Sequence, residues 1–175
     1  MDAINAFDIA ALDPEIRSRI IFRKTIPAKA PVYVPLPNDL APALVERLES
    51  RSIPQLYQHQ AQAIELIHSG QDLVIATSTS SGKSLCYQLP IVNDIANGAK
   101  STALMLFPTK ALAADQLRSM REWLIPGVKA VTYDGDADRN NRNWARGNAN
   151  VILTNPDMLH IGMLPNHRQW APYFR

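Results

Sequence analysis

Residues 72–85 read DLVIATSTSSGKSL, an apolar run followed by a loop of small residues that closes with Gly82, Lys83 and Ser84. The run at 73–76 predicts a buried strand, and the sequence after Gly82 predicts a helix that begins where the loop ends. Small side chains let backbone N–H groups converge on phosphate groups, and a helix N-terminus adds partial positive charge. This stretch therefore predicts a phosphate-binding loop that holds a nucleoside triphosphate.

Two side chains of this loop have specific predicted roles. Lys83 would reach the β and γ phosphates, and the hydroxyl of Ser84 would hold Mg²⁺. The strict pattern has glycine five positions before Gly82, where this chain has Thr77, and the GKS triplet also occurs at ordinary helix starts. The candidate nucleotide-binding residues of the loop are Thr77, Ser78, Thr79, Ser80, Ser81, Gly82, Lys83 and Ser84.

The composition is that of an ordinary globular domain. The chain has 175 residues, of which 46% are hydrophobic and 19% charged, and its formal net charge of +2 permits a nucleic-acid-binding face without requiring one. The acidic N-terminus lacks signal-peptide character, and no apolar run approaches the roughly twenty residues that span a bilayer. We expect a cytoplasmic protein without a membrane partner. The single cysteine, Cys86, excludes an internal disulfide.

The order of expected elements divides the chain into an extension and a domain. Five of the thirteen prolines fall within 27–42, so residues 1–38 are expected to form an N-terminal extension, with a strand at 20–26, and a proline-rich arm. Residues 39–175 are expected to form an α/β domain. Its expected helices are 40–48, 59–67, 83–96, 109–123, 136–147 and one from 156, and its expected strands are 73–76, 102–108, 129–133 and 150–154.

Strands that alternate with helices of this length predict parallel pairing, with helices on both faces of the sheet. Ligands of such sheets bind at the carboxyl ends of the strands. Three polar segments lie there: LFPTKALAADQ (106–116), TYDGD (132–136) and TNPDML (154–159). Each segment also fits a simpler interpretation as a capped helix start, because Thr, Asp and Asn are usual N-cap residues.

Together with LYQHQAQAI (56–64) upstream, the three segments have an order that resembles the first RecA-like domain of a superfamily-two DEAD/DEAH-box-type helicase. The resemblance implies a three-layer RecA-like P-loop NTPase domain with a parallel sheet. It also implies that Gln60 reads the adenine edge and that the three segments hold the backbone of one nucleic-acid strand. The nucleic-acid-binding residues that it implies are Pro108, Thr109, Lys110, Gly135, Asp136, Thr154, Asn155, Pro156 and Asp157.

The stretches IPQLYQHQAQAI, ATSTSSGKSLCYQLPIV and TNPDMLHIGMLPNHRQW are similar to the DNA helicases with a cysteine-containing C-terminal domain, the mitomycin repair factor A subgroup. That resemblance implies ATP and Mg²⁺ as cofactors, 3′ to 5′ translocation on single-stranded or partly duplex DNA, and a role in DNA repair. The chain departs from the family at three positions. Where this chain has Ser78 and Ser80, the family often has Gly and Ala, and where it has Ala43, related box helicases have an aromatic residue. Whether Tyr33 or Tyr57 stacks on adenine instead stays open.

The helicase mechanism requires a strand that ends in Asp-Glu and a second RecA-like domain with arginine fingers. Residues 1–175 contain neither, so we expect the N-terminal portion of a helicase, incomplete at its C-terminus, with no complete catalytic set and no ATP hydrolysis of its own. The missing C-terminal helicase domain would be needed for activity. One alternative is a non-catalytic remnant that binds nucleotide or nucleic acid. A small P-loop kinase is a weaker alternative, because about seventy residues precede the loop.

One basic stretch belongs to neither motif. The helix expected over 136–147 carries Arg139, Arg142 and Arg146, which either extend a basic nucleic-acid track or form a solvated face.

Overall fold

The computed structural model describes residues 13–22, 24, 30–79, 81–135 and 139–174, and it divides into two units, 1–31 and 32–175. In the first unit, α1 (Pro14–Ser18) begins after Asp13, whose carboxylate accepts a hydrogen bond from the N–H of Glu15. The strand expected at 20–26 is not found at residues 20–22 and 24, and its other residues lie outside the described part.

The second unit begins with a two-stranded antiparallel ribbon that the sequence did not predict. β1 (Tyr33–Pro35) pairs with β2 (Gln55–Tyr57), and α2 (Pro42–Ser50) lies between them in the chain. α3 (Gln58–His68) follows β2 directly, and α4 (Lys83–Ala96) follows the phosphate loop. These three helices have the places that the sequence predicted.

The sheet confirms the predicted parallel α/β class. Its strands are β3 (Ala103–Leu106), β4 (Ala130–Thr132) and β5 (Val151–Thr154), in the order β3-β5-β4 and all parallel. The helices α5 (Lys110–Arg121) and α6 (Arg139–Asn148) connect them as expected.

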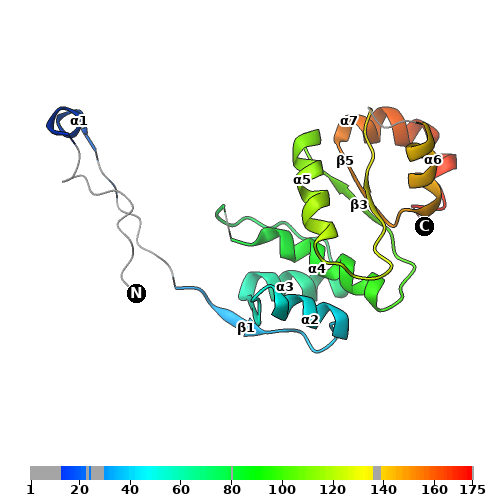
Figure 1. The fold of residues 1–175 in the computed structure, drawn as a ribbon, viewed down its shortest axis with the longest axis horizontal. Coiled ribbons are helices and arrows are strands. Elements are labelled where there is room, and N and C mark those ends of the chain that lie inside the picture. The colour runs from blue at the N-terminus through cyan, green and yellow to red at the C-terminus, as the bar shows by residue number, and fades with distance from the viewer. Residues whose placement is uncertain (1–12, 23, 25–29, 80, 136–138, 175) are drawn as a thin grey trace. The chain divides into compact units, whose positions relative to one another are not determined.

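Helices cover both faces of this sheet, and β5 supplies core residues to both faces (Figure 1). Val151 and Leu153 belong to the larger apolar cluster, which includes residues of α2, α3, α4 and α5. Ile152 points to the opposite face and packs in a second cluster with Ala145 and Trp170. All four β5 residues are buried, as a strand with helices on both faces requires.

The chain after β5 is helical in short pieces rather than in the single helix that was expected. α7 (Pro156–Met158) leads into a π-helical turn, η2 (Leu159–Met163), a 3₁₀ turn, η3 (Leu164–Asn166), and α8 (His167–Trp170). Tyr173, just beyond α8, is buried among these elements.

The prediction of a buried strand at 73–76 is wrong in this structure. None of residues 71–78 is in a strand, and the side chain of Val74 is 95% exposed. A strand forms only where a neighbouring strand accepts its hydrogen bonds, and no described strand lies beside this segment. The apolar run thus has the composition of a strand without the partner that a strand needs.

Tyr173 provides a test of how the sheet is held at the amino ends of its strands. Its hydroxyl donates to the carbonyl of Ala103, at 2.5 Å, and accepts a hydrogen bond from the N–H of Ile152, at 3.0 Å. Tyr173→Phe removes a buried hydroxyl that is hydrogen-bonded to both strands, so unfolding in urea is expected to show a loss of about 0.5–1.5 kcal/mol.

The matched control is Tyr33→Phe, which removes a hydroxyl from a side chain that is half exposed. It should change stability by no more than about 0.5 kcal/mol. Equal stability of the Tyr173→Phe variant and the wild type would show that this bridge between β3 and β5 contributes nothing.

Candidate functional site

The phosphate loop closes around the ammonium group of Lys83. Nζ of Lys83 donates to the backbone carbonyls of Thr77, at 3.1 Å, and Ser78, at 2.6 Å. The hydroxyls of Thr77 and Ser81 lie 2.6 Å apart, in hydrogen-bond contact across the loop. The side chain of Lys83 therefore occupies the mouth of the loop, where it can exchange carbonyl partners for phosphate oxygens. Ser80 lies outside the described residues.

Two features of the structure favour glycine at position 82 of the loop, namely its backbone conformation and the side chain beside it. Its φ of +73° places it in the left-handed region, which L-residues with a side chain rarely adopt. A Cβ on Gly82 would also lie 2.5 Å from Nε2 of Gln60. Both the backbone conformation and the neighbouring side chain therefore disfavour a larger residue where α4 begins.

Gln60 joins the start of α3 to the phosphate loop. Its side chain is buried, and Nε2 donates to the carbonyl of Gly82 at 2.9 Å, while Oε1 accepts a hydrogen bond from the N–H of Tyr57 at 2.9 Å. His59 adds a second link, with Nε2 lying 3.0 Å from the carbonyl oxygen of Ser81. No sequence pattern predicted this role of His59, because its partner is a backbone carbonyl more than twenty residues away in the chain.

A cavity of about 400 Å³ lies between Gln60 and the aromatic residues of the ribbon. Tyr33 and Tyr57 line it, and their rings stack with centroids 5.0 Å apart. Gly82 and Leu85 form the wall on the side of the loop. Both tyrosines that the sequence left as alternatives are thus beside the phosphate loop, packed on each other.

The residues around Ser84 have the chemistry that a phosphate-bound Mg²⁺ requires. Oγ of Ser84 is 3.4 Å from the hydroxyl of Tyr87, a weak contact that leaves its lone pairs available. Ser84 and Lys83 line one side of a cavity of about 660 Å³, which Phe107 and Gln116 line from the direction of β3 and α5. Across the described part of the chain, no three His, Cys, Asp or Glu side chains group as a metal site.

Parallel pairing brings the three polar segments to one edge of the sheet. The ladder continues past the strand ends, because the N–H of Phe107 donates to the carbonyl of Thr154 and the N–H of Tyr133 donates to that of Leu153. The segment after β5 therefore lies between the segments after β3 and β4. The sequence predicted that the three segments lie at the carboxyl ends of parallel strands, but not which of them lies in the middle.

Several of the polar side chains in these segments are hydrogen-bonded within the protein. The side chains of Thr109 and Asn155 cap α5 and α7 by accepting from the N–H groups of Leu112 and Met158. Thr154 is buried, and its hydroxyl donates to the carbonyl of Tyr133 at 2.5 Å. The capping interpretation is thus correct for two segments, and Thr154 joins the end of β5 to the segment that follows β4.

Most of the candidate nucleic-acid-binding residues lie on the surface. The exposed ones are Pro108, Thr109, Lys110, Gly135, Pro156 and Asp157, and Asn155 is partly buried. Asp136 lies outside the described residues. A ligand at this edge would meet exposed helix starts at α5 and α7, with the Lys110 side chain beside the first.

Comparison with known proteins gives one family and several relatives. Residues 57–173 match the DEAD/DEAH box helicase family. The chain is 45% identical over 154 residues to the ATP-dependent helicase HRQ1 of Saccharomyces cerevisiae, and 40% identical over 143 residues to the uncharacterized ATP-dependent helicase YprA of Bacillus subtilis. These alignments cover 85% and 80% of this chain, but 14% and 19% of the two relatives.

A solved structure shares the same fold. The DUF1998 helicase MrfA, crystallised with DNA and AMPPNP, superposes with a TM-score of 0.79 at 39% identity. The match covers 83% of this chain and 21% of that structure. The chain thus spans about a fifth or less of each of these proteins. Within the described residues, no helix is long and apolar enough to cross a membrane.

The contact between Gly82 and Gln60 can be tested with a matched pair of glycine substitutions. Gly82→Ala places a Cβ in the left-handed region and against Nε2 of Gln60, whereas Gly98→Ala, at φ +80°, has no atom within 4 Å of the new Cβ. Both substitutions carry the left-handed penalty of about 1–2 kcal/mol. Gly82→Ala should cost more in a urea denaturation experiment, and it alone should weaken binding of a fluorescent ATP analogue. Equal effects of the two changes would contradict the account of Gly82.

Proposed function

The chain belongs to the DEAD/DEAH box helicase family, and from this premise we propose that it forms the nucleotide-binding part of an ATP-dependent DNA helicase. One observation carries the proposal: the buried Gln60 is hydrogen-bonded to Gly82 of the phosphate loop, so the predicted adenine-side residue and the phosphate-side residues form one site. The neighbouring solved helicase was crystallised with AMPPNP, an ATP analogue, which supports nucleotide as the ligand.

The contacts of the residues in the proposed nucleotide site place each of them where it would meet one part of ATP. Lys83 exchanges the carbonyls of Thr77 and Ser78 for β and γ phosphate oxygens, and the backbone N–H groups at the start of α4 complete the cradle. Ser84 would hold Mg²⁺, which would neutralise charge on the phosphates. The stacked Tyr33 and Tyr57 form the aromatic wall against which an adenine ring packs.

We also propose that the carboxyl edge of the sheet binds the backbone of a single DNA strand. The starts of α5 and α7 are exposed at this edge, where helix N-termini attract phosphate groups, and Lys110 adds a positive charge. Binding to DNA is supported by the neighbouring helicase that was crystallised with it. The capping hydrogen bonds of Thr109 and Asn155 hold these two helix starts in position for binding.

The finer assignments rest on the resemblance to the mitomycin repair factor A subgroup. They are translocation with 3′ to 5′ polarity, DNA repair, and location in the cytoplasm or on the nucleoid. Hydrolysis requires an Asp-Glu pair that residues 1–175 do not contain. We therefore assign nucleotide binding and strand binding to this chain, and turnover to the larger protein that its relatives represent.

Substitution of Lys83 tests the nucleotide site. Charged hydrogen bonds to phosphate contribute about 1.5–3 kcal/mol, so Lys83→Ala should weaken binding of a fluorescent ATP analogue tenfold or more. Lys100→Ala removes a charge from an exposed lysine outside the loop and should leave affinity unchanged. Identical affinities of the wild type and Lys83→Ala would reject the phosphate loop as a nucleotide site.

The assignment of turnover predicts that the 175-residue chain releases phosphate from ATP only at the background rate, with or without single-stranded DNA. A coupled phosphate-release assay checks this directly, with Lys83→Ala as the blank. Steady-state release that rises with added DNA and disappears in Lys83→Ala would mean that the chain carries its own catalytic groups.

A further inference from the structure

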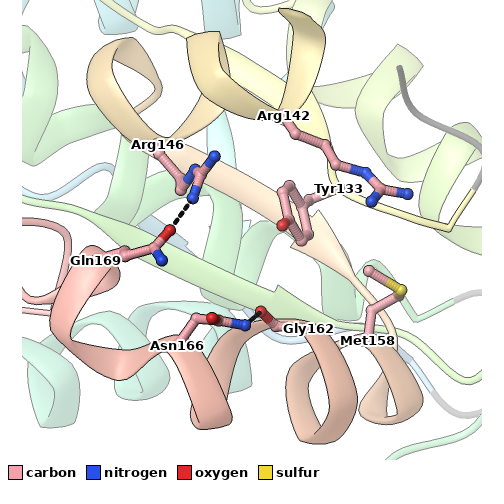
Figure 2. A pocket seen from close by; sticks show the side chains of 7 residues that line it. All are labelled: Tyr133, Arg142, Arg146, Met158, Gly162, Asn166 and Gln169. Atoms are coloured by element: carbon pink, nitrogen blue, oxygen red, sulfur yellow. Dashed lines mark hydrogen bonds between the residues drawn. The ribbon is translucent and has the colours of Figure 1, made fainter. Parts of the chain in front are cut away.

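A pocket of about 360 Å³ lies apart from the nucleotide site, between α6 and the short helices that follow β5 (Figure 2). Arg142 and Arg146 line it from α6, and Tyr133 lies between them in the view of Figure 2. Gly162 and Gln169 line the facing wall. The two arginines are one helical turn apart, so both side chains reach the same cavity.

Among the residues that the structure describes, the hydrogen-bond acceptors of the two pocket arginines carry no negative charge. Arg142 donates from Nη2 to the backbone carbonyl of Gly135, at 2.7 Å, and Arg146 donates to the side-chain amides of Gln169 and Asn143. All of these acceptors are neutral. Among the described residues that line the pocket there is no carboxylate.

One hydrogen-bond donor of Arg142, its Nε, has no acceptor among the described residues. This nitrogen atom is buried. A buried donor on a charged group costs free energy unless a partner arrives, and an anion satisfies both the hydrogen bond and the charge. The planar guanidinium fork suits the two oxygens of a phosphate group.

The facing wall contains a closely packed π-helical turn. Gly162 lies in the π-helical turn η2, and a Cβ there would come within 3.0 Å of the Cε atom of Met158. π-Helical turns occur frequently at functional sites. The side-chain amide of Asn166 donates to the carbonyl of Gly162 at 3.1 Å and fixes this turn against the next.

The position of the pocket indicates which phosphate it receives. Tyr133 belongs to the segment after β4, and Met158 belongs to the segment after β5. Both segments form the edge to which the proposed function assigns a DNA strand. We propose that the Arg142–Arg146 pocket binds one backbone phosphate of that strand, as a site additional to the helix starts of α5 and α7. This inference rests on the proposed nucleic-acid function.

The test is the salt dependence of binding to a fluorescent oligothymidylate. Each phosphate contact on a single strand contributes about 0.7 to the slope of log affinity against log salt. Arg142→Gln should lower the slope by about that amount, which is about fivefold in affinity at 0.1 M salt. The control, Arg121→Gln, removes the same charge from an exposed position at the far end of α5 and should leave the slope unchanged.

A second variant avoids altering either arginine. Gln169→Glu keeps the side-chain size and places a carboxylate beside Arg146, so it should also weaken oligothymidylate binding. Thermal melting of each variant, compared with the wild type, separates a lost contact from a lost fold.

The outcomes are distinguishable. If the wild type binds and Arg142→Gln and Gln169→Glu behave like Arg121→Gln, the pocket inference fails while strand binding stands. If, in addition, inorganic phosphate binds to the wild type and not to Arg142→Gln, the pocket belongs to a free phosphate and the assignment to nucleic acid is overturned. If the wild type does not bind the oligonucleotide, this inference and the proposed strand binding fail together.

Discussion

The arrangement of the proposed strand-binding edge depends on β5, which is hydrogen-bonded on both edges to parallel strands. Four consecutive residues of β5 are buried, and alternate ones support the cores on opposite faces of the sheet. Parallel pairing directs the three carboxyl ends to one edge. At the amino ends, the hydroxyl of Tyr173 bridges β3 and β5. The polar segments at 106–116, 132–136 and 154–159 are therefore neighbours because β5 is central.

The nucleotide loop is held from a different direction. Gln60 and His59 connect it to the start of α3, and Gly82 fits beneath Gln60 only because it lacks a side chain. Beyond the loop, the side chain of Gln88 on α4 is hydrogen-bonded to Gln116 on α5 and to the indole of Trp123. Packing and buried amide hydrogen bonds thus connect the loop to the helix that begins at the proposed strand-binding edge.

The sequence predicted most of the fold because the helices and the three paired strands have local patterns. It failed at 73–76, since a strand depends on a neighbour that no local pattern encodes, and it missed β1 and β2, which have only three residues each. For the site, the loop and the strand-end segments were recognisable from their residues. The hydrogen bonds of Thr154 and His59 were not, because their acceptors are backbone carbonyls more than twenty residues away in the chain. The Arg142–Arg146 pocket likewise exists only after α6 and the turns after β5 are brought together.

The most direct test of the central claim is a map of backbone amide NMR shifts on titration with a short oligothymidylate. If the carboxyl edge binds the strand, the shifts should be concentrated at the starts of α5 and α7, around Gly135, and along the side of α6 that carries Arg142. Shifts confined to the opposite edge of the sheet, near Arg121 and Tyr173, would contradict the claim that the carboxyl ends of the strands form the nucleic-acid-binding surface.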